Sequence, residues 1–150
     1  MRMVIQRVSE ASVKIDNEIV GQIDAGMMVL LGVEEADGRE DADWLIQKIL
    51  GLRIFNDEDG KMNKSIAEIN GRFLIVSQFT LYASTKKGNR PSYIRAARPE
   101  HAIPLYDYFI DQLGKLSNTK IETGKFGADM KVSLTNDGPV TILIDSKSRE

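Results

Sequence analysis

Cysteine is absent from the 150-residue sequence, and His101 is its only histidine. The absence of cysteine excludes disulfide bridges, cysteine-bound zinc and thiol catalysis. A Ser-His-Asp triad or a histidine-bearing metal site would have to use His101, which stands at the start of a predicted helix. We interpret it as a surface histidine near a helix N-terminus, so the chain offers no reliable general base.

Long hydrophobic runs are also missing. No stretch approaches the length of a membrane span, and the apolar run at the N-terminus is too short and too interrupted for a signal peptide. Phosphate-cradling glycine loops are missing too, because the nearest candidate, residues 124–127, is too short for one such pattern and wrongly spaced for the other. We therefore expect a cytoplasmic protein without a membrane anchor, a metal or a nucleotide cofactor.

Acidic residues are absent between Ile69 and Pro99, although the whole chain carries 22 acidic and 20 basic side chains and a net charge of −2. Such asymmetry lets a mildly acidic protein present one positive face to a polyanion. A solvated basic loop without a ligand is the alternative that composition leaves open. The basic residues of this segment are Arg72, Lys86, Lys87, Arg90, Arg95 and Arg98.

Short strands dominate the first third of the chain. Alternating apolar and polar residues predict strands at 3–8, 11–15, 18–23 and 27–33, the last two joined by a turn at 24–26. Four strands before any helix suggest an antiparallel meander. A length of 150 residues suits one domain, residues 1–150, and the later elements make it a strand-rich mixed α/β domain.

Two amphipathic helices are predicted. Apolar residues recur at helical spacing from Glu40 to Leu50, and again after Pro99 as far as Leu113. In the second helix, Pro104 is tolerable only in the first turn. The residue after Leu113, a glycine, is a candidate for the C-terminal cap, with a helix that runs a few residues further as the alternative.

The remaining elements are shorter. The pattern predicts a short strand at 52–55, a polar turn at 56–60 and a compact central strand at 73–78. Two final strands, 130–134 and 140–144, are expected around a turn.

The first segment that could carry chemistry is Ser77-Gln78-Phe79-Thr80-Leu81, at the end of the predicted central strand. An amide, an aromatic ring and a hydroxyl placed together at a strand end are a plausible pocket wall. The alternative is structural: Ser77 and Thr80 satisfy backbone groups where the strand ends, and Phe79 belongs to the core.

The second segment is Asn136-Asp137-Gly138-Pro139-Val140-Thr141. Its composition is that of a hairpin turn. Pro139 fits poorly in a two-residue hairpin, because its φ is fixed near −65°. A cis peptide bond is one solution, although only about 5–6% of X-Pro bonds in folded proteins adopt it.

Together these segments resemble the S-Q-x-T-L and N-x-G-P-V-T motifs of the D-aminoacyl-tRNA deacylase family, and residues 126–130 resemble its F-x-A-x-M pattern. The resemblance extends over essentially the whole chain. Further segments that carry it are Ile5-Gln6-Arg7-Val8, Gly32-Val33, Gly60-Lys61-Met62-Asn63 and Arg90-Pro91-Ser92.

The resemblance implies a homodimer of barrel-like α/β subunits, with two active sites at the subunit interface. Gly138-Pro139 of one subunit, joined by a cis bond, would enter the pocket of the other. Its carbonyl oxygens would hold the α-amino group of a D-aminoacyl ester and exclude the side chain of an L-residue. Glycine, which has no side chain to exclude, should be accepted.

The resemblance also assigns roles to single residues. Gln78, Phe79 and Thr80 would form the catalytic wall, and the 2′-OH of the terminal adenosine would help to activate water. Two other functions stay open: a non-catalytic RNA-binding module and a metabolic hydrolase of a free ester or amide. Neither DNA nor a cofactor is expected to bind. The remaining assignments are Ser77 to the substrate pocket, Phe126 and Met130 to the adenosine, and Lys86, Lys87, Arg90 and Arg95 to tRNA phosphates.

Overall fold

The computed structural model describes residues 1–150 and centres on one long strand, β1 (Arg2–Ile15). β3 (Gly26–Gly32) pairs antiparallel with the first half of β1, and β2 (Glu18–Ile23) pairs antiparallel with its second half. The strands expected at 3–8 and 11–15 are therefore one strand. The expected meander is also wrong, because β3 pairs with β1 rather than with β2.

β8 (Lys131–Asp145) runs antiparallel along the whole of β1 and explains why that strand is continuous. The two strands expected at 130–134 and 140–144 are the two halves of β8. Both halves pair with β1 in the same direction, so the chain does not reverse between them and the expected hairpin turn is wrong. The register shifts between Asn136 and Thr141, so the residues between them bulge from the sheet.

β6 (Arg72–Ser77) lies parallel to β3, and the two-residue strand β7 (Glu122–Thr123) lies parallel to β6. β7 also lies against β2, so the sheet curls into a nearly closed barrel. An apolar cluster from β1, β2, β3 and β6 fills it and includes Val13 and Leu74. The strand expected at 73–78 is confirmed as β6.

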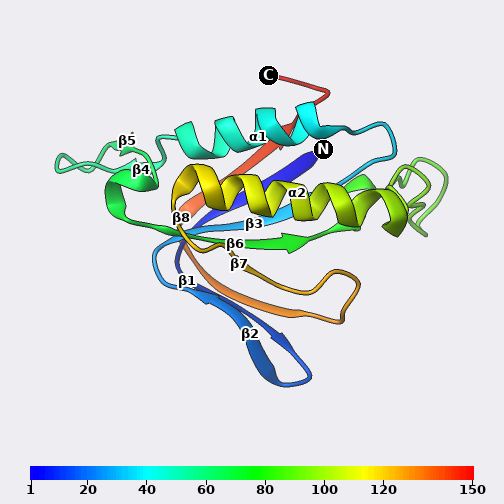
Figure 1. Ribbon diagram of the computed structural model, residues 1–150, viewed down its shortest axis with the longest axis horizontal. Coiled ribbons are helices and arrows are strands. Elements are labelled where there is room, and N and C mark those ends of the chain that lie inside the picture. Colours follow the sequence, from blue (N-terminus) through cyan, green and yellow to red (C-terminus); the bar gives the residue numbers. More distant parts are fainter.

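α1 (Arg39–Gly51) and α2 (Pro99–Ser117) cover one face of the sheet (Figure 1). The larger core lies between the helices and the sheet, where Leu45, Phe73 and Phe109 are buried. The expected class, a strand-rich, barrel-like α/β fold with two main helices, is confirmed. Neither helix combines the length and the hydrophobicity needed to cross a membrane.

α2 departs from expectation in its first turns, and at its C-terminal end it follows the longer alternative. It begins at Pro99, so Pro104 lies in its second turn and not in the first. The burial of Leu105 and Phe109 on the same helix offsets the hydrogen bond that the proline cannot donate. The helix runs through Gly114 and ends at Ser117, and Asn118, with a φ of 53°, caps it in the left-handed conformation.

Short elements fill the connections. The strand expected at 52–55 reduces to β4 (Phe55–Asn56), which pairs with β5 (Met62–Lys64). The polar turn between them is confirmed, and the Asp57 carboxylate accepts backbone hydrogen bonds within it. The 3₁₀ turns η1 (Ala67–Ile69) and η2 (Phe79–Tyr82) were not expected.

Asp41, in the first turn of α1, joins the helix to the C-terminal segment. Its buried carboxylate accepts hydrogen bonds from the Gly38 N–H at 2.9 Å and from the Lys147 ammonium at 2.8 Å. Burial raises the pKa of Asp41, but hydrogen bonds from Lys147, the Gly38 N–H and Ser146 outweigh it and lower the pKa to about 2. The folded protein therefore stabilises the charged carboxylate.

We expect Asp41→Asn to lower the free energy of unfolding at pH 7 by about 1.5–3 kcal/mol, the usual contribution of a hydrogen bond to a charged group. The pKa of an unfolded aspartate is about 3.9. Because the folded pKa is lower, the contribution is complete above that value and is lost as the pH falls towards 2. Urea unfolding at pH 7, 5, 4 and 3 should show the two proteins converging, whereas Asp111→Asn, at an exposed ion pair on α2, should change little.

Candidate active site

A pocket of about 270 Å³ lies at the carboxyl end of β6. One wall comes from the end of that strand and the start of η2, and the other from the segment that leads into β8. Five of the predicted site residues therefore meet in one pocket, although the two walls lie about fifty positions apart in the chain. The lining residues are Val76, Ser77, Gln78, Phe79, Phe126, Gly127, Ala128, Asp129, Met130 and Val132.

The first wall is formed where the chain leaves the sheet. The Gln78 N–H donates to the Leu31 carbonyl at 2.8 Å, and the chain then turns into η2. Phe79 and Thr80 are the first residues of this helical turn, so their backbone N–H groups have no acceptor within it. Two backbone donors are thus left without a helical acceptor, and one of them belongs to Phe79, which lines the pocket.

Thr80 has no base to activate it. The Gln78 amide donates to the Thr80 hydroxyl at 2.5 Å, and in either orientation an amide is too weak a base to take the hydroxyl proton. His101 is half-buried and its ring nitrogen lies 2.9 Å from the Asp37 carbonyl oxygen, so it is not the purely surface residue expected. Thr80 itself does not line the pocket.

The second wall is braced by the core. The Phe126 ring packs edge-on against Tyr106, with ring centres 6.2 Å apart. The Tyr106 hydroxyl donates to the Ile75 carbonyl at 2.9 Å, and burial raises the pKa of that phenol. Met130 packs over Gly124, where a Cβ atom would lie 2.3 Å from the methionine sulfur.

Asp129 is the only acidic or basic residue that lines the pocket. Its side chain is 85% exposed and its carboxylate lies 2.8 Å from the Lys131 ammonium. It therefore points to solvent and is already paired. Gly127, Ala128 and Asp129 also line the pocket but were not predicted individually from the sequence, although the F-x-A-x-M pattern spans them.

Gly138 and Pro139 do not line this pocket. They lie in the β8 bulge, are exposed, and are joined by a cis peptide bond, in agreement with the expectation from the sequence. A Cβ atom on Gly138 would lie 2.0 Å from the Val140 nitrogen, so only glycine fits there. The Asn136 amide closes the bulge by donating to the carbonyls of Arg7 and Val140, both at 3.0 Å.

Arg7 ties the bulge to the rest of the fold. Its buried guanidinium donates to the Asp137 carbonyl at 2.6 Å and to the Ile54 carbonyl at 2.7 Å. A third bond joins it to the Asn56 side chain at 3.2 Å. One side chain on β1 thus holds the bulge against the segment around β4.

The predicted tRNA-binding residues lie in the loop that follows η2. Lys86, Lys87 and Arg90 are exposed and have no ion-pair partner. Arg95 differs, because its guanidinium lies 2.9 Å from the Glu34 carboxylate. We therefore expect the first three residues to make most of any phosphate contacts.

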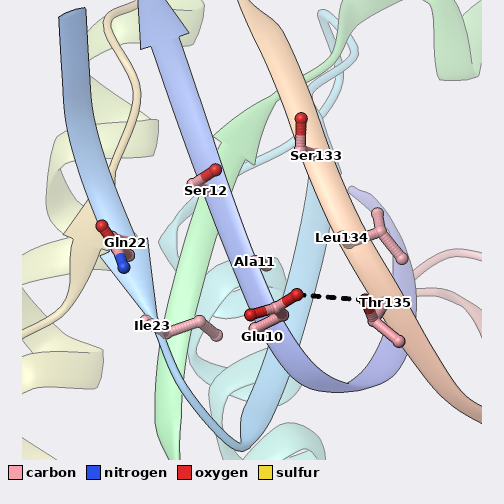
Figure 2. A pocket seen from close by; sticks show the side chains of 8 residues that line it. All are labelled: Glu10, Ala11, Ser12, Gln22, Ile23, Ser133, Leu134 and Thr135. Atoms are coloured by element: carbon pink, nitrogen blue, oxygen red, sulfur yellow. Dashed lines mark hydrogen bonds between the residues drawn. The ribbon is translucent and has the colours of Figure 1, made fainter.

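Two other cavities lack the predicted site residues. One, of about 320 Å³, lies on the outer face of β1, β2 and β8, where the Thr135 hydroxyl donates to the Glu10 carboxylate (Figure 2). The other, of about 580 Å³, lies between α1 and β8, next to Trp44 and Leu143. The pocket at the end of β6 is smaller than either, but of these three cavities it alone is lined by predicted site residues, from the S-Q-x-T-L segment and from the F-x-A-x-M segment.

Comparisons with known proteins identify the family. The sequence model of the family described as D-Tyr-tRNA(Tyr) deacylase matches residues 4–145. D-aminoacyl-tRNA deacylases of Bacteroides fragilis strain YCH46 and Akkermansia muciniphila are 62% and 59% identical to this chain, with complete coverage of both sequences in each case.

Solved structures share the fold. A protein named c-Myc DNA Unwinding Element Binding Protein matches with a TM-score of 0.90 and 42% identity, over 97% of this chain and 98% of its own. A probable eukaryotic D-amino acid tRNA deacylase matches with a TM-score of 0.82, over 95% and 97% of the two chains. At 17% identity, the second match concerns the fold alone.

The fold, the pocket and these matches define a hydrolase that acts on the ester bond of an aminoacyl-tRNA. The chain belongs to the D-aminoacyl-tRNA deacylase family.

Proposed function

We propose that the pocket hydrolyses D-aminoacyl-tRNA and glycyl-tRNA, and rejects L-aminoacyl-tRNA through Gly138-Pro139 of a second copy of the chain. One observation carries the proposal: both family motifs are present, but only the first lines the pocket. Gly138 and Pro139 are exposed on a bulge that Arg7 holds in place, so they are available to another subunit. A symmetric dimer would supply two such contacts at once.

Chirality would be read by backbone carbonyls. With the α-amino group held by the carbonyl oxygens of Gly138 and Pro139, a D side chain points away from them and an L side chain points into them. Such a clash with backbone carbonyls would reject L-substrates without any contribution from a side chain of the protein. A glycyl ester has no side chain and would therefore be accepted.

The reaction would use backbone donors and the substrate itself. Water adds to the ester carbonyl, whose oxygen accepts hydrogen bonds from the N–H groups of Phe79 and Thr80 as it becomes negative. The free 2′-OH of the terminal adenosine assists the proton transfer from water, and the 3′-oxygen leaves with a proton as the acid is released. Phe126 and Met130 would line the adenosine site.

The exposed residues Lys86, Lys87 and Arg90 would contact tRNA phosphates, which gives affinity without sequence preference. Because a relative of known structure is named for binding a DNA element, the binding test includes a single-stranded DNA of matched length. We expect weaker binding of that DNA than of the tRNA.

The decisive measurement is the deacylation of matched D-tyrosyl-, L-tyrosyl- and glycyl-tRNA. We expect efficient hydrolysis of the D- and glycyl-substrates, with the L-substrate slower by at least about 100-fold, since a clash of about 2.8 kcal/mol suffices. An RNA-binding module would protect all three esters. A metabolic hydrolase would cleave D-tyrosine ethyl ester as readily as the tRNA, which would contradict the proposal.

A further inference from the structure

An apolar surface is exposed at the edge of the pocket, and the proposed reaction assigns no role to its side chains. The Phe79 ring is 54% exposed, and Tyr93 packs edge-on against it with ring centres 5.0 Å apart and planes at 72°. Ile94 follows Tyr93 and is 92% exposed, more than any other large apolar residue in the chain. Exposed aromatic rings at the mouth of a pocket need an explanation, since burying them would be favourable.

The same surface is attached directly to the basic loop, residues 85–91. Ser84 and Ser92 close this loop with two backbone hydrogen bonds of 2.8 and 2.9 Å, and Tyr93 follows immediately. The loop lies beyond the N-terminal end of α2 (Figure 1). Positive charge and exposed aromatic rings are therefore held side by side by a short closed stem.

This combination fits single-stranded nucleic acid. Proteins bind unpaired bases by stacking them on aromatic rings while basic side chains follow the phosphates. Bases inside a duplex already stack on their neighbours, so such a surface selects the unpaired end of a strand. An apolar protein partner would not require the basic loop beside the rings.

We propose that Phe79, Tyr93 and Ile94 form a stacking surface for the unpaired nucleotide that precedes the terminal adenosine of the tRNA. The inference rests on the proposed function, which places that adenosine between Phe126 and Met130. Phe79 lines the pocket on one side and contacts Tyr93 on the other, so the stacking surface begins where the pocket ends. The nucleotide that precedes the adenosine would therefore lie on the stacking surface.

The stacking surface also explains the position of Ile94. The Ala96 N–H donates to the Tyr93 carbonyl at 3.0 Å, and this turn carries Ile94 to its outer corner. An isoleucine there extends the apolar area beyond the two rings. It would pack against the ribose or the outer face of the same base.

The test compares two substrates that differ only in the nucleotides before the adenosine: D-tyrosyl-tRNA and D-tyrosyl-adenosine. We expect Tyr93→Ala to raise KM for the tRNA by about tenfold or more, the usual effect of losing one stacked base, with little change in kcat. KM for D-tyrosyl-adenosine should stay at the wild-type value. Tyr93→Phe should behave as wild type, and Ile94→Ala should give a smaller effect of the same kind.

Tyr108→Ala is the matched control, because this tyrosine lies on α2 and bonds to Asp43 away from the pocket. Equal losses on both substrates in Tyr93→Ala would mean that Tyr93 only braces Phe79, and would overturn the stacking surface. An unchanged KM for the tRNA would overturn it as well. Failure of the proposed function looks different, since the wild-type protein would then cleave neither substrate.

Discussion

Replacing Arg7 with alanine is expected to lower kcat/KM for D-tyrosyl-tRNA by about 100-fold, the cost of misplacing a positioning group by about 1 Å. Arg7 donates to the Asp137 carbonyl, one residue before Gly138, and anchors it to Ile54. Without the guanidinium, the bulge loses its link to the segment around β4, although the hydrogen bonds of Asn136 remain. Single-turnover hydrolysis of D- and L-tyrosyl-tRNA measures the effect, which should be larger for the D-substrate.

Arg53→Ala provides the control for loss of an arginine near the same region. Arg53 also donates to a backbone carbonyl, that of Asn63 at 2.7 Å, but this contact is exposed and does not touch the bulge. Its activity should stay within about twofold of wild type, since exposed contacts of this kind contribute little. Equal losses in both variants would show that Arg7 does not act through the bulge.

The proposal that two subunits share each site allows a second test of Arg7. In a heterodimer of an Arg7→Ala subunit and a subunit whose pocket is filled by Ala128→Trp, one site combines an intact pocket with an intact bulge. Such heterodimers should recover about half of the wild-type activity, although each homodimer is impaired. No recovery would mean that the bulge serves the pocket of its own chain.

Sequence patterns predicted the elements that depend on neighbouring residues. The apolar spacing of α1 and the compact run of β6 are local signals, and both elements are where they were expected. β8 was mispredicted, because the turn-forming residues at 136–139 are typical of a hairpin when only the neighbouring sequence is considered. Only pairing of both halves with β1, more than a hundred positions away, shows that the strand continues.

The site residues that local sequence predicted are likewise those that depend on neighbouring residues, and those that depend on distant contacts were missed. Ser77, Gln78 and Phe79 were found because they are adjacent in sequence and end a predictable strand. Arg7 was noted only as part of a family resemblance, since nothing near it in the sequence indicates contact with a bulge 130 positions later. Tyr93 was missed because one tyrosine in a basic loop has no pattern until Phe79 is placed beside it.

Removing the 2′-OH of the terminal adenosine is expected to slow hydrolysis of D-tyrosyl-tRNA by about 100- to 10,000-fold, the range for loss of a positioned proton-transfer group. The pocket supplies no replacement, because the Thr80 hydroxyl is bonded to an amide and Asp129 is exposed and paired. The measurement is single-turnover hydrolysis of a 3′-linked ester on tRNA that ends in 2′-deoxyadenosine. A 2′-deoxy substitution one nucleotide earlier is the matched control and should have little effect.

The variant Thr80→Ala tests whether the protein hydroxyl takes part in the same proton transfer. If the tRNA hydroxyl carries the proton transfer, this variant should keep activity within about tenfold of wild type, because it loses only a hydrogen bond to Gln78. The backbone N–H of residue 80 remains, so the donors for the ester oxygen are unchanged. The opposite pattern, a collapse in Thr80→Ala with normal hydrolysis of the 2′-deoxy substrate, would make Thr80 the nucleophile. Mass spectrometry would then detect an acyl group on Thr80.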